Sequence, residues 1–314
     1  MEVNMLRIGT QSDTWYSNED PDGSIAFYRS CGFDAIDFDL NKYIRCGELK
    51  DAEPPFTSFY DKSLDELYEF FAPLKAACKR HDVKIAQIHA PFSSWYNGKD
   101  AFNEYMIGVH KKCIAIAAFL ECPGVVIHPV HGAGDREWDV NLWQYRSLIP
   151  AAKKYGVKIL LENIFGRFNG RFIQGRLSSP DRACEMFDTL ESEAGEGVFG
   201  FCFDVGHAII TCQDIPGFVR KLGHRLTNLH IHDNNGLDDL HLIPYSCLTT
   251  GTNLVCNWDG FVDALRDIGY KGAICFETFK SVRTMPAAVR PELLKLISAI
   301  GRHWAERIEA DGAC

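Results

Sequence analysis

Residues 157–164, VKILLENI, and residues 200–208, GFCFDVGHA, share the pattern that decides the fold of this chain. Each is a short apolar run, as in a strand buried on both faces. Each also brings metal-competent side chains to its end: Glu162 in the first, Asp204 and His207 in the second. Burying such groups is costly unless they are paired or bound to a cation. The same pattern recurs in KIAQIHAPF (84–92), GVVIHPV (124–130), LTNLHIHDN (226–234) and GAICFETF (272–279), which indicates strands that converge on one polar site.

Strand-like and helix-like segments alternate along the whole chain, and no Gly-rich phosphate loop follows the first strand, as a doubly wound sheet would usually require. Eight strand–helix units in 314 residues therefore predict a single-domain (β/α)8 TIM barrel over residues 1–314. The predicted strands are 6–11, 34–40, 84–90, 124–130, 157–164, 199–205, 227–233 and 273–279. The predicted helices are 24–31, 63–81, 100–121, 143–155, 179–192, 215–223, 258–268 and 288–309.

The connections that follow the strands of such a barrel lie at its carboxyl-terminal mouth, where substrate binds. The long ones here are 41–62, 131–142, 165–178 and 234–257. The ends of the first two strands add Gln11, Trp15, Asp37 and Asp39 as candidate lining residues. Trp15, Phe92 and Trp95 could stack against a sugar, although ordinary packing of aromatic residues is the simpler explanation.

The composition limits the class of partner. The formal net charge of -9 gives no general attraction to nucleic acid or anionic lipid. Twelve cysteines without a CxxC pair predict reduced thiols rather than a disulfide framework. The first residues show no signal-peptide pattern, and the longest apolar run, 113–120, is too short to span a bilayer. We therefore expect a soluble, cytoplasmic protein, with no membrane partner and nucleic acid disfavoured; a homo-oligomer is compatible with this sequence.

Strands five to eight predict a metal site. They supply Glu162, Asp204, His232 and Glu277, a mostly oxygen ligand set that suits Mn²⁺, Mg²⁺ or Co²⁺, with Zn²⁺ also compatible. A single glutamate at a strand end could equally pair with a lysine or arginine, but the apolar runs of these strands supply few basic residues.

Other histidines are assigned with less support from the pattern. We place His230 on the opposite face of its strand from His232, toward a helix, and give it no role. Four histidines in helices or at helix ends also receive no role: His81, His110, His224 and His303. Five residues remain candidates for substrate contact or for additional metal binding: His89, His128, His207, Asp239 and His241.

The connection after the fifth strand contains FGRFNGRFIQGR and carries Arg167, Arg171 and Arg176. Solvated loops commonly carry such charges. Alternatively, the three arginines could form a clamp for a substrate phosphate or carboxylate.

The stretches QIHAPF, VVIHPV, LLENIFG, FDVGHA, HIHDNNGLDDLHL and CFETF resemble the xylose isomerase-like barrel superfamily over nearly the whole chain. This superfamily holds sugar isomerases, ketose 3-epimerases, inosose dehydratases and class II apurinic endonucleases. In the epimerases two glutamates, an aspartate and a histidine bind one divalent ion, and a histidine after the aspartate contacts substrate. The resemblance implies these roles for Glu162, Asp204, His232, Glu277 and His207.

Two comparisons within the superfamily keep alternatives open. The endonucleases use nine ligands for three zinc ions, and this chain has a candidate at each position: the five residues just named together with His89, His128, Asp239 and His241. The ketose 3-epimerases place an arginine shortly after the metal histidine, whereas this chain has DNNGLDD there. A free-ketose substrate therefore does not carry over from the resemblance.

The favoured function is a metal-dependent isomerase or epimerase of a small sugar or sugar phosphate. A divalent cation would polarise the sugar carbonyl. Glu162 or Glu277 would then remove a proton, giving a cis-enediolate, and the other glutamate would return a proton. The alternatives are a zinc-dependent apurinic endonuclease-type phosphodiesterase, an inosose-type dehydratase, and a metal- or sugar-binding barrel without activity.

Overall fold

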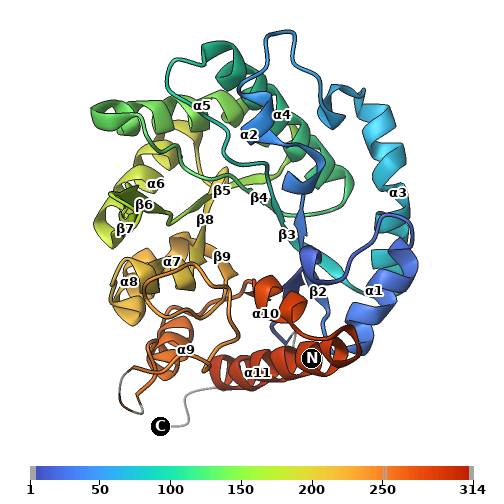
Figure 1. The fold of residues 1–314 in the computed structure, drawn as a ribbon, viewed down its shortest axis with the longest axis vertical. Helices are drawn as coiled ribbons and strands as arrows, with labels where there is room; N and C mark the ends of the chain where they lie inside the picture. Colours follow the sequence, from blue (N-terminus) through green and yellow to red (C-terminus); the bar gives the residue numbers. More distant parts are fainter. Residues whose placement is uncertain (1–4, 250, 252, 311–314) are drawn as a thin grey trace.

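The computed structural model describes residues 5–249, 251 and 253–310, and these form one parallel barrel surrounded by helices (Figure 1). The predicted fold class, a single-domain (β/α)8 barrel, is confirmed. The remaining residues of the predicted 1–314 domain lie outside the described residues. The eight barrel strands are β1 (Ile8–Gln11), β2 (Ala35–Asp39), β3 (Lys84–His89), β4 (Gly124–Val126), β5 (Lys158–Glu162), β8 (Phe199–Asp204), β9 (Leu226–His230) and β10 (Ile274–Phe276).

The strands close into a ring. Their order is β10-β1-β2-β3-β4-β5-β8-β9, and every pair in this order is parallel. Hydrogen bonds just past β9 join its chain to β10: the Ile231 amide donates to the Cys275 carbonyl at 3.0 Å, and the Glu277 amide donates to the Ile231 carbonyl at 2.9 Å. Since all strands run the same way, their carboxyl ends meet at one mouth.

The outer ring contains the eight predicted helices. The helix predicted to start at residue 143 begins at Glu137, which shortens the preceding connection. Ser63 and Ser179 cap their helices, each side chain accepting from a backbone amide of the first turn. The eight helices are α1 (Pro21–Ser30), α3 (Leu64–Arg80), α4 (Asp100–Phe119), α5 (Glu137–Tyr155), α6 (Pro180–Ala194), α8 (Ile215–Leu222), α9 (Trp258–Asp267) and α11 (Arg290–Glu309).

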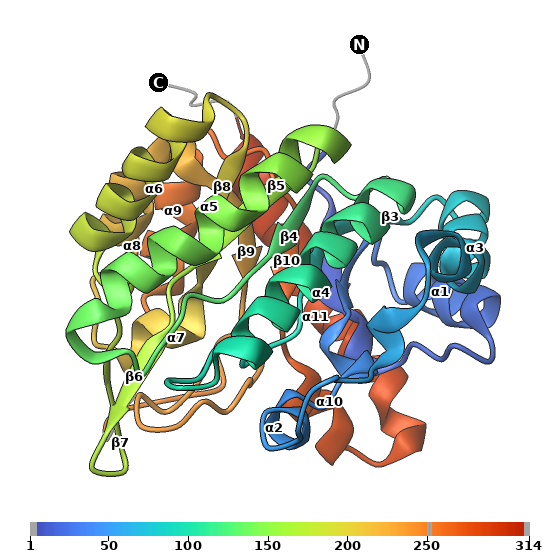
Figure 2. The ribbon, with the colours of Figure 1, turned by 90° about the horizontal axis from the view of Figure 1, so that it is seen from above.

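Short elements that the sequence did not predict lie in the connections, most of them at the mouth. The connection 165–178, expected as a loop, contains an antiparallel hairpin of β6 (Phe165–Phe168) and β7 (Arg171–Gln174). Its turn is Asn169–Gly170, both at positive φ, the conformation that a two-residue hairpin turn prefers. Figure 2 shows this hairpin at the same end of the molecule as α2 and α10. The other short segments are α2 (Cys46–Leu49), α7 (Val205–Ile210), α10 (Phe279–Thr284) and the 3-10 turns Ser12–Thr14, Asn41–Tyr43, Phe59–Asp61, Gly134–Arg136, Gly223–Arg225 and Ala287–Val289.

The interior of the barrel is divided between an apolar base and a polar mouth. The main hydrophobic core lies between strands and helices, where Trp258 and Trp304 stack with ring centroids 5.4 Å apart. A separate small cluster of Val126, Leu160 and Cys202 fills part of the barrel's inside. The polar side chains at the strand ends lie beyond this apolar base, so the groups that could react or bind a metal gather at one end of the barrel.

The described cysteines are all unpaired; ten are buried and Cys212 is exposed. Among the described residues, no helix combines the length and the apolar character needed to cross a lipid bilayer.

Candidate metal centre

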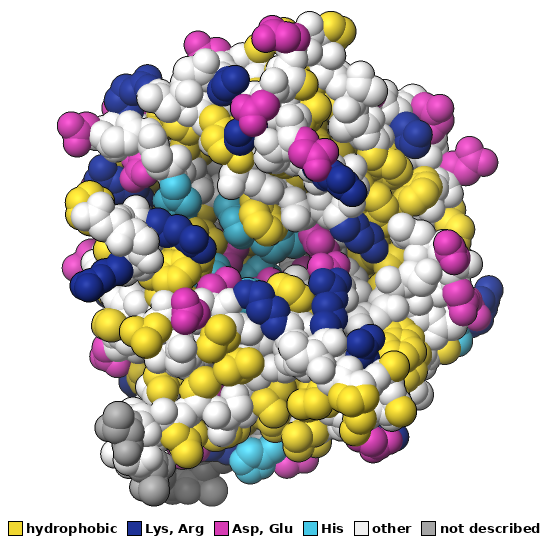
Figure 3. All heavy atoms as spheres, in the orientation of Figure 1, with side chains coloured by type: hydrophobic (Ala, Val, Ile, Leu, Met, Phe, Trp, Pro, Cys, Tyr) yellow, Lys and Arg dark blue, Asp and Glu magenta, His cyan; other side chains and the backbone are white. Residues whose placement is uncertain are grey.

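One cavity of about 1340 Å³ opens at the carboxyl-terminal mouth. Figure 3 shows it as a central hollow with histidine and acidic side chains at its bottom and with Lys and Arg side chains nearby. Asp204 and His232 are fully buried. The predicted site residues that line the cavity are His89, His128, Glu162, His207, Asp239, His241, Glu277, Arg167 and Arg176.

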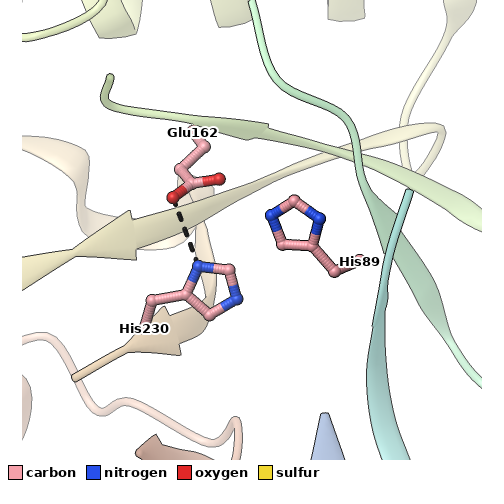
Figure 4. A group of neighbouring side chains, drawn as sticks. All are labelled: His89, Glu162 and His230. Carbon is pink, nitrogen blue, oxygen red and sulfur yellow. Dashed lines mark hydrogen bonds and ion pairs between the residues drawn. The ribbon is translucent and has the colours of Figure 1, made fainter. Parts of the chain in front are cut away.

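The histidine that meets the carboxylates is His230. Its Nδ1 atom lies 3.2 Å from Glu162 Oε1, 3.7 Å from Glu277 Oε2 and 4.0 Å from Asp204 Oδ2. His89 adds a further imidazole (Figure 4). We call these five residues the His230 cluster; they come from the ends of β3, β5, β8 and β9 and from the residue after β10.

The prediction that His230 faces a helix is wrong. Residues two apart in a strand point to the same side, so His230 and His232 share a face and Ile231 takes the other. The His230 side chain is about 1% exposed and points into the barrel, while Ile231 belongs to the outer hydrophobic core. The same strand therefore presents two inward histidines, and His230 is the one that all three carboxylates approach.

A second row of polar groups holds the His230 cluster from below. His230 Nε2 lies 2.8 Å from Asp37 Oδ2, which also accepts from Gln87 Nε2 at 2.9 Å. A carboxylate on one ring nitrogen fixes the ring orientation and aims the other nitrogen at a metal. Gln11 Nε2 donates to Glu277 Oε1 at 3.0 Å. Asp37 and Gln11, predicted only as lining, thus orient two members of the cluster.

His128 joins this cluster from one side. Its Nε2 atom lies 2.9 Å from His89 Nε2 and 3.1 Å from Glu162 Oε2. The Phe92 ring stacks on the His128 ring with centroids 4.6 Å apart and lines the cavity. The other two aromatic residues predicted as a sugar wall lie elsewhere: Trp15 stacks on Phe27, and Trp95 lines a separate small pocket.

A second group of ligand-type side chains adjoins the first and shares Asp204 with it. His232 Nε2 lies 3.2 Å from Asp204 Oδ1 and 3.8 Å from Asp239 Oδ1. The His241 ring stacks on the His232 ring at 4.1 Å, and His207 Nδ1 lies 3.6 Å from Asp204 Oδ2. We call Asp204, His207, His232, Asp239 and His241 the His232 cluster. The predicted ligand His232 therefore lies beside the three-carboxylate site rather than at its centre.

The residues present fit a divalent cation. Glu162 Oε2, Asp204 Oδ2, Asp239 Oδ1 and His232 Nε2 are buried and have no hydrogen-bond partner among the described residues. They approach other ligand atoms closely without the angles of a hydrogen bond. Buried polar atoms are costly unless satisfied. Carboxylate oxygens and imidazole nitrogens that converge in this way suit Mn²⁺, Mg²⁺, Co²⁺ or Zn²⁺.

The two glutamates have opposite electrostatic surroundings. Burial raises the pKa of Glu277 well above its ordinary value. Burial alone would also raise the pKa of Glu162, but the nearby His128 and His230 hold it well below its ordinary value. Burial likewise opposes protonation of His232, yet Asp204 raises its pKa to about 9. The cluster thus offers two carboxyl groups of different proton affinity, each with an oxygen near His230 Nδ1.

The three predicted clamp arginines do not all reach the cavity. Arg176 Nε donates to Glu137 Oε2 at 2.8 Å. Arg167 lines the cavity and stacks on Phe172, its guanidinium carbon 4.6 Å from the ring centroid. Arg171 is exposed, pairs in register with Phe168 and does not line the cavity.

Comparison with known proteins gives three kinds of match. Residues 25–299 match a family model described as a xylose isomerase-like TIM barrel. An uncharacterized protein of Methanocaldococcus jannaschii is 32% identical over 231 residues, which cover 69% of this chain and 70% of that protein.

Solved structures share the fold at low identity. A D-tagatose 3-epimerase-like protein superposes with a TM-score of 0.63 at 24% identity, covering 95% of this chain and 99% of that one. The 3-keto-D-glucoside 4-epimerase of E. coli gives a TM-score of 0.69 at 14% identity, with 95% and 99% covered.

Proposed function

The chain belongs to the xylose isomerase-like TIM barrel family, and we propose that it is a divalent-metal-dependent isomerase or epimerase of a sugar or sugar derivative. One observation carries the proposal: His230 Nδ1 lies within 4.0 Å of oxygens of Glu162, Asp204 and Glu277 at the bottom of a large cavity. Structures of the same fold that are named as sugar epimerases support the reaction class.

Glu162, Asp204, His230 and Glu277 would hold the cation, which would polarise a substrate carbonyl and acidify the proton on the adjacent carbon. Glu162 and Glu277 both line the cavity, and they come from β5 and from the end of β10, with β8 and β9 between them. One carboxylate removes the proton and the other returns one at a different position or on a different face. Gln11, bonded to Glu277 Oε1, fixes which oxygen of that glutamate faces the sugar.

The remaining lining residues would position the sugar. The Phe92 ring, stacked on His128, offers an apolar face to the carbon skeleton. His207 lines the cavity beside Glu162, with Nδ1 3.5 Å from Glu162 Oε1, and its Nδ1 also lies 2.9 Å from the Asn163 carbonyl. If that nitrogen carries the proton, Nε2 remains free to accept from a hydroxyl of the substrate.

Proton exchange with solvent tests the proposal. The Mn²⁺-loaded protein is incubated in deuterated water with D-fructose, D-tagatose, L-ribulose and their phosphate esters. We expect deuterium on a carbon next to the carbonyl, loss of exchange after chelation, and recovery when Mn²⁺ is returned. A protein that binds Mn²⁺ at the cluster by metal analysis but exchanges no proton on any of these sugars would contradict the proposal. Loss of a hydroxyl in the products would instead identify the dehydratase reaction.

A second candidate, a phosphodiesterase that cuts abasic duplex, is favoured by the His232 cluster, because it places further ligand-type groups beside the first site. The formal net charge of -9 disfavours it. A nicking assay on abasic duplex, with the bound ions counted per chain, distinguishes the two: cleavage together with more than one ion per chain would favour the phosphodiesterase.

A further inference from the structure

Among the described residues, four side chains of lysine or arginine line the cavity, and three of them have a hydrogen-bond or ion-pair partner there. Arg176 is bonded to Glu137 and to the Gly134 carbonyl. Arg182 pairs with Glu185 and stacks on Trp138, its guanidinium carbon 4.2 Å from the ring centroid. Lys280 donates to the Asp239 backbone carbonyl and lies 3.9 Å from Asp239 Oδ2. The fourth cation is Arg167.

Arg167 is held by aromatic rings instead of by an acid. Its guanidinium carbon lies 4.6 Å from the Phe172 centroid and 5.9 Å from the Phe165 centroid. No carboxylate among the described residues forms an ion pair with it. A guanidinium stacked on an aromatic face keeps its N–H groups directed outward in its own plane, where they can bind an anion in a bidentate manner.

The hairpin directs Arg167 to the cavity and Arg171 away from it. Arg167 pairs across the hairpin with Phe172, and Phe165 pairs with Gln174, so these four side chains share one face. Phe165, Arg167 and Gln174 line the cavity. Arg171 is on the other face, opposite Phe168, whose side chain is 66% exposed. Gly166 and Ile173 of that other face also line the cavity, but Arg171 does not. The same hairpin thus carries one exposed arginine that borders the cavity, Arg167, and one that does not, Arg171.

Arg167 and the metal centre border the same cavity and are linked through two neighbouring side chains. Phe165, which contacts Arg167, lies edge-on to the His207 ring with centroids 4.9 Å apart. His207 Nδ1 lies 3.5 Å from Glu162 Oε1. The cavity of about 1340 Å³ exceeds the roughly 300–1,000 Å³ of ordinary small-molecule sites, so a sugar at the cluster leaves room for a substituent beside the hairpin.

We propose that the substrate is an anionic sugar, bearing a phosphate or a carboxylate that Arg167 binds while the sugar carbonyl lies at the His230 cluster. This inference rests on the proposed function for the position of the sugar part. In a chain of net charge -9, an arginine with no acidic partner at the cavity supplies the local positive charge that an anionic substituent needs. Specificity for the charged substrate would then reside in the hairpin and the reaction in the barrel.

The experiment compares matched charged and uncharged ketoses in matched variants. The probes are D-fructose, D-fructose 6-phosphate and D-fructuronate, and the readouts are kcat/KM for deuterium exchange and, separately, the dissociation constant from calorimetric titration. We expect one charged probe to exceed D-fructose by about tenfold or more, the usual size of a charge-assisted bond. Arg167→Gln should lower this charged-to-uncharged ratio about tenfold, and Arg167→Lys should restore part of it. Arg171→Gln, which changes the same charge on the other face, should leave the ratio as in the wild type.

The outcomes separate this inference from the proposed function. Preference for the phosphate ester or for the carboxylate identifies the anionic group. Exchange on ketoses with a ratio that Arg167→Gln does not change, or that Arg171→Gln changes equally, overturns the anionic substrate and leaves the reaction class intact. If no ketose exchanges, the ratio of the dissociation constants for charged and uncharged probes decides. Tighter binding of a charged probe that Arg167→Gln weakens supports the anion site. Equal binding of charged and uncharged probes, or a preference that Arg167→Gln leaves unchanged, refutes it.

Discussion

The His230 cluster and the His232 cluster are made of the same residue types and share Asp204, yet their central histidines are held differently. His230 has both ring nitrogens engaged, with Nε2 at Asp37 and Nδ1 facing Glu162. His232 has neither nitrogen in a hydrogen bond among the described residues. It lies against Gly206 and stacks on His241. The comparison teaches that one imidazole is oriented before any cation binds and the other is not.

The supporting elements explain this difference. The His230 cluster comes from the ends of barrel strands, which the closed sheet fixes relative to one another. Three members of the His232 cluster, His232, Asp239 and His241, lie after the end of β9, and His207 lies on the short α7. Ligands on rigid elements hold a metal geometry more precisely than ligands on loops. We therefore expect the His230 cluster to be the principal metal and reaction site.

The largest effect should come from Glu277→Gln. Removing one of two acid–base carboxyls should lower kcat for proton exchange by about 10²–10⁴-fold, measured with Mn²⁺ content confirmed in each sample. Glu137→Gln, a cavity-lining glutamate paired with Arg176 outside both clusters, is the matched control and should have a much smaller effect. Equal losses in the two variants would remove Glu277 from the reaction.

His230→Ala and His232→Ala compare the clusters directly. Because His230 meets three carboxylates, its removal should weaken Mn²⁺ binding by at least about 100-fold, more than the loss of a supporting partner causes. His232→Ala should weaken it by less than about tenfold. Titration calorimetry gives both values. A larger loss in His232→Ala would move the principal site to the His232 cluster.

Asp37→Asn tests whether the pre-oriented histidine matters. Replacing the carboxylate that holds His230 Nε2 should weaken Mn²⁺ binding by about 10–100-fold. Asp22 makes a similar contact with a histidine at the surface, since Asp22 Oδ1 lies 2.9 Å from His81 Nε2. Asp22→Asn should leave Mn²⁺ binding unchanged. If the two variants behaved alike, orientation of His230 would not be the source of the difference between the clusters.

The smallest effect should come from Gly206→Ala, which disturbs the His232 cluster alone. An added methyl would lie 1.8 Å from His232 Cε1, so the ring must move. We expect a loss of about 1 kcal/mol in unfolding free energy, near the lower end for overpacking, because an imidazole without hydrogen bonds can swing aside. A methyl added by Gly108→Ala in α4 meets no atom of the described residues within 4 Å, and this change should stabilise the protein by about 0.5–1 kcal/mol. Urea unfolding measures both; a stabilising Gly206→Ala would show that His232 does not occupy this position.

Much of the fold could be predicted because its periodic patterns are local. Apolar runs and helical stripes located all eight strand–helix units, and their parallel alternation implied the barrel. The start of α5 at Glu137 was missed although Trp138, Leu142 and Tyr145 lie at helical spacing, a signal that the sequence contained. The β6–β7 hairpin was also missed, although the Asn169–Gly170 dipeptide in the sequence is a hairpin-turn signal.

The candidate site could be predicted to the level of the strand ends and no further. Glu162, Asp204 and Glu277 were identified because carboxylates interrupt apolar runs. His230 was missed because it was assigned to the opposite strand face from His232. The sequence itself contained the signal, since residues two apart in a strand, such as 230 and 232, share a face. The separation of Arg167 from Arg171 could not be predicted before the hairpin was known, because it depends on which face of that hairpin meets the cavity.

The sequence by itself determined that strand ends rich in carboxylates and imidazoles would meet at one mouth, because the order of apolar and polar residues along each strand is a local property. Only the tertiary structure decided which histidine the carboxylates approach, which arginine keeps a free charge, and which acid supports which ring. The choice of arginine depends on which face of the β6–β7 hairpin meets the cavity. The choices of histidine and acid depend on distances of a few ångströms between residues far apart in the chain. Only closure of the barrel, which joins the residues after β9 to β10, fixes these distances.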